Sequence, residues 1–129
     1  MSFRTIGVIT AIVTLVLGAG YLFVGAFFVG RWQIEPTGSV LLFVRRMGAL
    51  YLGLSVIFFL ARSAPVSVAR PALSAGTAVA CSLLALLGVY ELTSGGAGQA
   101  ILASLVVESL LALGYIGILF TERRGVVGG

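Results

Sequence analysis

The sequence predicts an all-α membrane protein: a compact bundle of four transmembrane helices that forms a single domain over residues 1–129. Composition is the first observation behind this prediction. Of the 129 residues, 60% are hydrophobic and only 9% are charged, whereas about 25% of the residues of an average soluble domain are charged. The second observation is that the apolar residues fall into four long runs. Each run has the roughly 20 residues that a helix needs to cross a bilayer.

The first predicted span covers residues 6–30 and follows Arg4, as the apolar core of a signal peptide would. The run is too long for a signal core, however, and no small-residue cleavage motif follows it. We therefore expect it to stay in the protein as a helix. Ala11, Gly18 and Gly25 recur every seven positions along it. Small residues of this kind let transmembrane helices approach closely.

The other spans are predicted at residues 40–61, 71–92 and 100–120. The connections RWQIEPTG, SAPVSVAR and TSGGAG separate the four spans, and the three prolines fall in connections or at a helix start, where proline costs little. In the third span, small residues recur every four positions at Ala72, Gly76 and Ala80. We interpret this stripe as a packing face inside the bundle. A contact with another subunit is the alternative.

Arginine supplies all the positive charge of the chain, and its distribution predicts the orientation. With both termini cytoplasmic, five arginines lie inside (Arg4, Arg62, Arg70, Arg123 and Arg124) and three lie outside (Arg31, Arg45 and Arg46). An excess of basic residues on the cytoplasmic side is typical of membrane proteins. We therefore expect a multi-pass protein of the cell inner (plasma) membrane. Trp32 and Tyr90 would then lie in an outer aromatic belt, and the dispersed arginines argue against a nucleic-acid partner.

A glutamate lies within the fourth apolar run, in the stretch LVVESLLAL of residues 105–113. Glu108 is some eight residues into its span, which is about 12 Å along a helix, and Tyr51, Cys81 and Tyr21 occupy similar depths in their own spans. An ionised side chain at the bilayer centre costs about 2.5–3.5 kcal/mol, so we expect Glu108 to face the bundle interior. The same helical face carries Ile101, Ser104, Leu105, Leu111, Ala112 and Tyr115.

Three environments are open to Glu108. It is protonated and hydrogen-bonded to Tyr51 or a backbone carbonyl, or ionised and paired with Arg45 or Arg46, or it lines a water-accessible cavity. The two arginines lie about 100° apart on their helix, so one can face inward, toward Glu91 or Glu108, while the other reaches lipid headgroups. These five residues are the candidates for a ligand-binding site or a polar core. We interpret Glu108 first as a buried polar contact that fixes the helix register; a ligand-binding or proton-handling role and an ion pair with a partner subunit are the alternatives.

Two motifs carry a resemblance to a known family. An arginine is followed by G-x-x-Y-L-G-L, residues 48–54 of RRMGALYLGLSVIFFLAR, and Glu108 lies in the last helix, in VVESLLALGYIGIL. From about Gly25 onward the chain resembles a family of small bacterial four-helix membrane proteins, loosely similar to the DoxX-like proteins. The third helix departs from that pattern, because it has Glu91 where an arginine is expected. The resemblance implies an architecture and brings no settled activity.

The residue types restrict the function. The chain has no His, Asp or Lys and has one cysteine, Cys81. These types supply the ligands of haem, copper and iron–sulfur centres and the groups of Ser–His–Asp and Schiff-base catalysis. We therefore expect no cofactor and no metal, and favour a non-enzymatic protein.

Three functions agree with these residues. The favoured one is an accessory or structural subunit of an inner-membrane assembly, in contact with the bilayer and with partner subunits or a second copy. The first alternative is a protein that binds or transports a lipid-like molecule in an outer-half cavity around Glu108. The second is a cofactor-independent isomerase or cyclase that uses Glu108 as general acid.

Overall fold

A computed structural model describes residues 2–95 and 99–127. It contains four helices, α1 (Phe3–Arg31), α2 (Gly38–Ala61), α3 (Ala69–Ser94) and α4 (Ile101–Val127). All four are long and apolar enough to cross a membrane. The prediction of an all-α protein with four spans is therefore confirmed. Of the predicted TSGGAG connection, residues 96–98 lie outside the described residues.

Local sequence signals explain where three of these helices begin or end. The hydroxyl of Ser2 accepts a hydrogen bond from the Thr5 N–H at 3.2 Å at the start of α1, and Thr37 does the same for the Val40 N–H at 3.3 Å before α2. Such side-chain caps satisfy backbone donors that have no partner within the helix. Helix α3 ends at Gly95, whose φ of 77° is a left-handed conformation that glycine adopts without steric cost.

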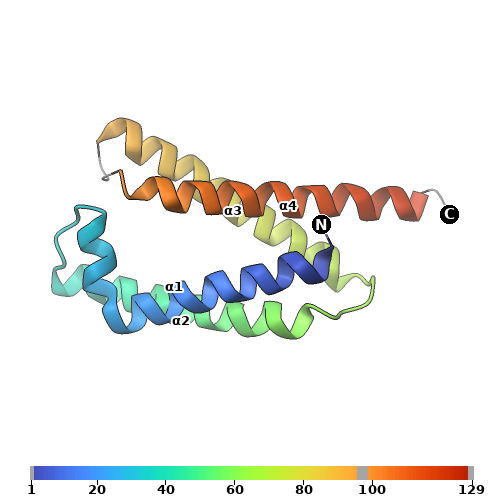
Figure 1. Cartoon of the computed structure of the whole chain (residues 1–129), viewed down its shortest axis with the longest axis horizontal. Coiled ribbons are helices and arrows are strands. Elements are labelled where there is room, and N and C mark those ends of the chain that lie inside the picture. The colour runs from blue at the N-terminus through green and yellow to red at the C-terminus, as the bar shows by residue number, and fades with distance from the viewer. Residues whose placement is uncertain (1, 96–98, 128–129) are drawn as a thin grey trace.

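The helices form two antiparallel hairpins, α1 with α2 and α3 with α4, and α1 also touches α4 over a much smaller area (Figure 1). We call the end of the molecule that holds both chain termini and the α2–α3 connection the terminal end. The opposite end, with the α1–α2 connection and the turn into α4, is the far end. The hairpins approach one another toward the terminal end and diverge toward the far end (Figure 1).

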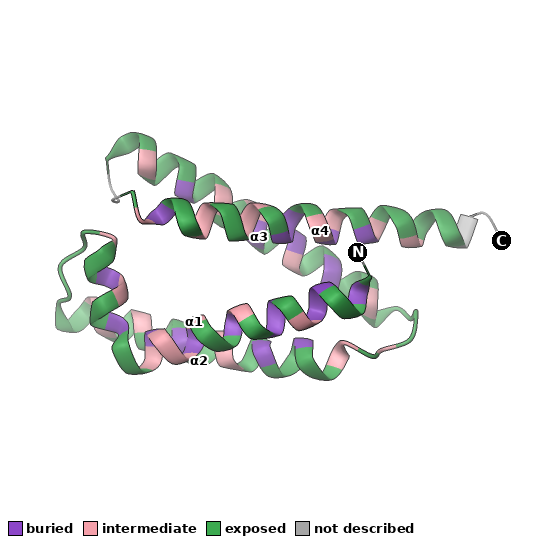
Figure 2. Cartoon of the chain, in the orientation of Figure 1, coloured by how far each residue is buried: buried purple, intermediate pink, exposed green. Residues whose placement is uncertain are grey.

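A core shared by all four helices lies in the terminal half of the molecule. Its buried members are Phe3, Ile6, Ala11, Phe58, Ala78, Cys81, Leu111, Ala112, Tyr115 and Ile118. Figure 2 shows these buried positions as purple stretches on the inner sides of the helices. Tyr115 is fully buried; its hydroxyl lies 2.7 Å from Thr10 Oγ1, and its ring centroid lies 5.8 Å from that of Phe58. One side chain thus joins α4 to α1 and α2, and the prediction that Cys81 is a small buried residue is confirmed.

Small residues set the contact between α1 and α2. The three residues of the predicted α1 stripe, Ala11, Gly18 and Gly25, are all buried. A Cβ atom on Gly48 of α2 would lie only 2.8 Å from the Gly18 carbonyl oxygen, and Ser55 Oγ donates a hydrogen bond to the Ala11 carbonyl at 2.7 Å. The two backbones therefore approach as closely as glycine allows, and the interpretation of this stripe as a packing face is confirmed.

The small-residue stripe of α3 does not pack within the chain. Ala72, Gly76 and Ala80 are exposed, while α3 buries the face with Ser74, Ala78, Cys81 and Gly88. This face is buried because Leu105 of α4 packs against Gly88, with a side-chain atom 3.0 Å from where a Cβ atom on Gly88 would be. The interpretation of the α3 stripe as an internal packing face is wrong.

Helix α1 breaks at Val24, which has the non-helical dihedral angles φ −131° and ψ 37°. Beyond the break the chain turns out of line with the rest of α1 (Figure 1). The ring of Trp32 thereby returns to within 6.0 Å of the Tyr21 ring, although 11 residues of straight helix would separate them by about 16 Å along the axis. Nothing in the sequence analysis predicted this break.

Candidate functional site

Glu108 lies on the inward face of α4. Ile101, Leu111, Ala112 and Tyr115 on that face are buried, and Glu108 itself is half-buried, as are Ser104 and Leu105. The prediction that Glu108 shares its face with the core-facing residues of α4 is confirmed. The carboxyl group lies on the far-end side of the shared core, where the two hairpins diverge.

Each of the other helices places at least one side chain within electrostatic range of Glu108. Tyr21 of α1, Tyr51 of α2 and Cys81 of α3 are three of these side chains. The rings of the two tyrosines are in edge-on contact, with their centroids 5.7 Å apart. Counting residues along the four spans predicts a similar depth for these three residues and Glu108, and we refer to the four as the Glu108 layer.

The Glu108 carboxyl group has no protein partner among the residues described. The ion pair found over the described ranges joins Arg70 to Glu122, and neither Tyr51 nor a backbone carbonyl bonds to Glu108 in this part of the chain. Of the three environments considered, the hydrogen bond to Tyr51 and the pair with Arg45 or Arg46 are therefore not formed. The carboxyl group is left facing the region between the hairpins.

The other candidate residues are placed differently. Arg45 and Arg46 are both exposed, because the close approach of Gly48 to α1 fixes the rotation of α2 and leaves these positions outside its packing face. Glu91 is exposed too, near the end of α3, but it lies within electrostatic range of Glu108. The structure thus places Tyr51 and Glu91 within electrostatic range of Glu108. It does not bring either arginine into the layer.

An aromatic cluster adjoins the Glu108 layer. Tyr21 is its centre, with Phe28, Trp32 and Tyr51 around it at centroid distances of 5.2, 6.0 and 5.7 Å. Tyr21 is buried, and the three outer rings are half-buried. Sequence reasoning missed this cluster because it assigned Trp32 to an interfacial belt. The sequence does contain a signal for this cluster: aromatic residues lie on both sides of Gly25, in YLFVGAFFVGRW.

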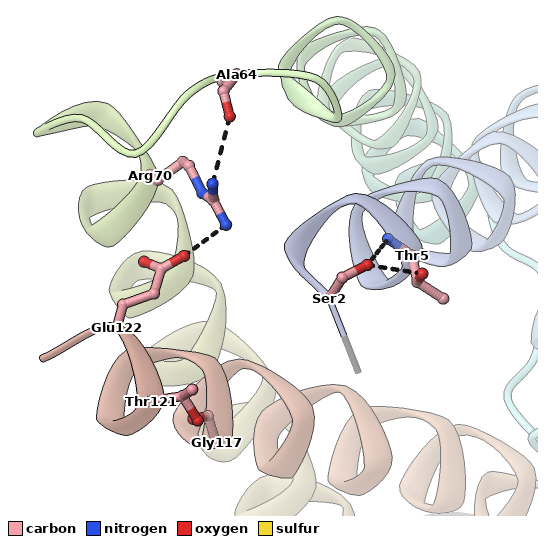
Figure 3. Close-up of polar contacts among 7 residues, drawn as sticks. All are labelled: Ser2, Thr5, Ala64, Arg70, Gly117, Thr121 and Glu122. Atoms are coloured by element: carbon pink, nitrogen blue, oxygen red, sulfur yellow. Dashed lines mark hydrogen bonds and ion pairs between the residues drawn. The ribbon is translucent and has the colours of Figure 1, made fainter. Parts of the chain in front are cut away.

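A second polar group missed by the sequence analysis lies at the terminal end (Figure 3). Arg70 Nη2 of α3 lies 2.6 Å from Glu122 Oε1 of α4, and both side chains are largely buried. The guanidinium also lies over the ring of Phe3, 4.5 Å from its centroid, and donates a hydrogen bond to the Ala64 carbonyl at 3.4 Å. The pair therefore ties α1, α3, α4 and the α2–α3 connection together.

The comparisons with known proteins identify no relative. No family model, curated protein or solved structure matches the chain. The resemblance to DoxX-like proteins therefore stays a prediction.

Proposed function

We propose that the chain is a membrane-embedded binding protein for an amphipathic, lipid-like molecule that lies between the hairpins at the Glu108 layer. One observation carries this proposal: Glu108 faces inward among all four helices and has no bonding partner among the described residues. A charged or polar group in hydrocarbon without a partner is costly. A ligand that bonds to the carboxyl group would remove this cost.

The divergence of the hairpins supports the proposal by giving such a molecule a way in. The chain exposes 8087 Å² of surface, compared with about 6,500 Å² for a compact monomer of this mass. The shared core occupies only the terminal half and the hairpins diverge beyond it (Figure 1), so we propose that such a molecule enters from lipid between them. An apolar chain would lie against the aliphatic side chains of the spans, and its polar head would meet Glu108 and the two tyrosines.

Native mass spectrometry of the protein in its own lipids tests this function. The wild-type protein should retain one defined small molecule at fixed stoichiometry, and Glu108→Leu should lose it. Glu35→Gln, in the exposed α1–α2 connection, is the matched control and should retain the molecule. A wild-type protein that carries only bulk lipids in variable number would contradict the proposal.

A second candidate function is an accessory subunit of a membrane assembly, and the exposed α3 stripe favours it. Nothing lies within 4 Å of a Cβ atom built on Gly76, so a helix of another protein could approach this face. In the same measurement a stoichiometric larger assembly, lost in Gly76→Leu, would favour the subunit function. The isomerase alternative gains no support from geometry, since Glu91, the second carboxyl group in range, is exposed.

A further inference from the structure

We infer that the molecule bound at the Glu108 layer carries a cationic head, such as a quaternary or tertiary ammonium group on an apolar body. This inference rests on the proposed function and names the ligand class of the same site. The geometry behind it is the juxtaposition of an unpaired carboxyl group and a cluster of aromatic rings, contributed by α4 and by α1 and α2.

The aromatic cluster has ring faces available to a cation. Tyr21 meets Phe28, Trp32 and Tyr51 at interplanar angles of 88°, 74° and 65°. Such edge-on contacts occupy the face of only one ring of each pair, and the outer rings are half-buried rather than enclosed. The face of an aromatic ring carries negative electrostatic potential and attracts cations within about 6 Å of its centroid.

The break in α1 is what assembles the cluster. Without it, Trp32 would lie beyond the reach of Tyr21, as the axial distance along a straight helix shows. Gly20 contributes as well, because the Phe28 ring occupies the space that any side chain at that position would need. A membrane span requires neither feature. Both bring aromatic rings against Tyr21, which lies within electrostatic range of Glu108.

The local charge selects against an anionic head. Glu108 and Glu91 are the formal charges in mutual electrostatic range, and neither has an ion-pair partner within residues 2–95 and 99–127. Arg31, the basic residue nearest the cluster along α1, lies over the ring of Phe27 instead, 5.7 Å from its centroid. A cationic head would pair with the ionised form of Glu108 and contact the aromatic rings, whereas an anionic head would meet the carboxyl group without a compensating arginine, since Arg45 and Arg46 are exposed.

Equilibrium binding of tetraphenylphosphonium to the full chain in lipid nanodiscs tests the inference. Saturable binding is expected, and it should weaken about tenfold or more in Glu108→Gln, as for the loss of a close charge pair. Trp32→Leu and Tyr51→Leu should weaken it about 2- to 30-fold each, the range of a cation–π contact. With partitioning into protein-free nanodiscs subtracted, since the membrane dipole potential favours anions in lipid, tetraphenylborate, an anion of the same size and shape, should show no saturable binding that Glu108→Gln removes.

Two matched controls should bind the phosphonium like the wild type. Glu35→Gln removes an exposed carboxylate, and Tyr90→Leu removes a tyrosine that is 67% exposed. Circular dichroism and gel filtration check that each variant folds.

If the phosphonium does not bind saturably, or binds equally to the wild type and to Glu108→Gln, the inference that the ligand has a cationic head is wrong. If mass spectrometry still shows a neutral or anionic molecule that Glu108→Leu loses, the binding function stands without that class. If the wild-type protein also retains no defined molecule, both the proposed binding function and the cationic ligand class are wrong.

Discussion

Two glutamates on the same helix have opposite environments. Glu122, near the end of α4, has the Arg70 guanidinium at 2.6 Å. Glu108 has no such partner among the described residues and faces the divergence of the hairpins. The Glu122 carboxyl group is paired with Arg70 and so stabilises the fold. The Glu108 carboxyl group remains available to a ligand, and for this reason Glu108, rather than the acidic residues as a group, is the candidate functional residue.

The hydroxyl group of Tyr115 should contribute measurably to stability. Thr10 donates its own hydroxyl proton to the Ile6 carbonyl at 2.8 Å, so Tyr115 is the donor in its 2.7 Å bond to Thr10. Tyr115→Phe should lower the free energy of unfolding by about 0.5–1.5 kcal/mol, measured by denaturation in mixed micelles. Tyr90→Phe, at an exposed position, should cause no change, and equal effects of the two substitutions would refute this role.

The Arg70–Glu122 pair should show a coupling energy between those of surface and buried ion pairs. Exposed pairs contribute about 0–1 kcal/mol, and breaking a fully buried one costs about 3–5 kcal/mol. Both partners are less than one-fifth exposed, so a double-mutant cycle of Arg70→Gln and Glu122→Gln should give about 1–3 kcal/mol. The same cycle with Arg123→Gln, an exposed neighbour, should give none. Additive effects at Arg70 and Glu122 would contradict the pairing.

At the residue scale, the sequence predicted how deep Glu108 lies and which face of its helix it occupies, but not which residues it contacts. The position of Glu108 in LVVESLLAL predicted its inward face correctly, since helical periodicity alone decides that face. The predicted inward arginine at position 45 or 46 depended on the rotation of α2, which is set by the Gly18–Gly48 contact. Arg70 and Glu122 lie on different helices, and no local pattern links them.

At the scale of the elements, the helices were predictable because bilayer thickness fixes the length of an apolar span. The break at Val24 was not, because no proline marks it. The contacts of Tyr21 with Phe28 and Trp32 form across the break, and no local motif predicts them. The unused α3 stripe could not be predicted either, because the buried face of α3 is the one on which Leu105 of α4 packs against Gly88.

Glycines of α2 should differ sharply in their tolerance of alanine. A Cβ atom on Gly48 would meet two backbone atoms, the Gly18 carbonyl oxygen at 2.8 Å and the Leu22 nitrogen at 2.9 Å. Gly48→Ala should therefore force α1 and α2 apart and destabilise the protein by about 1–3 kcal/mol. Gly53 has no atom within 4 Å of its Cβ position, so Gly53→Ala should be neutral or stabilise by up to about 1 kcal/mol. Unfolding in mixed micelles measures both, and equal values would argue against the close helix contact.

At the scale of the whole molecule, composition predicted the fold class but not the arrangement of the hairpins. In a bilayer, lipid chains are as apolar as the helix surfaces, so burial of apolar area does not force every helix against every other. The contacts that do form depend on specific side chains, such as Tyr115 with Thr10 and Arg70 with Glu122. These contacts occur in the terminal half, and the hairpins diverge beyond it (Figure 1).

The arginine distribution predicts that both termini are cytoplasmic, and both do lie at the same end of the molecule (Figure 1). In a Cys81→Ala background, a membrane-impermeant maleimide applied to intact cells should label Glu35→Cys but not Ser2→Cys. Both positions are exposed, so accessibility of the side chain does not limit the reaction. Labelling of Ser2→Cys alone would reverse the orientation.

The position of the break in α1 has a consequence for the choice of lipid. Residues 3–23, which precede Val24, extend roughly 31 Å, and the hydrocarbon core of a bilayer is about 30 Å thick. If Phe3 lies at one boundary of the hydrocarbon, the break lies near the other boundary, where water and headgroups can satisfy the freed backbone groups. A thicker bilayer would draw the break into hydrocarbon and favour a straight helix, which separates Trp32 from Tyr21. The lipid chain length would thus control whether the aromatic cluster exists.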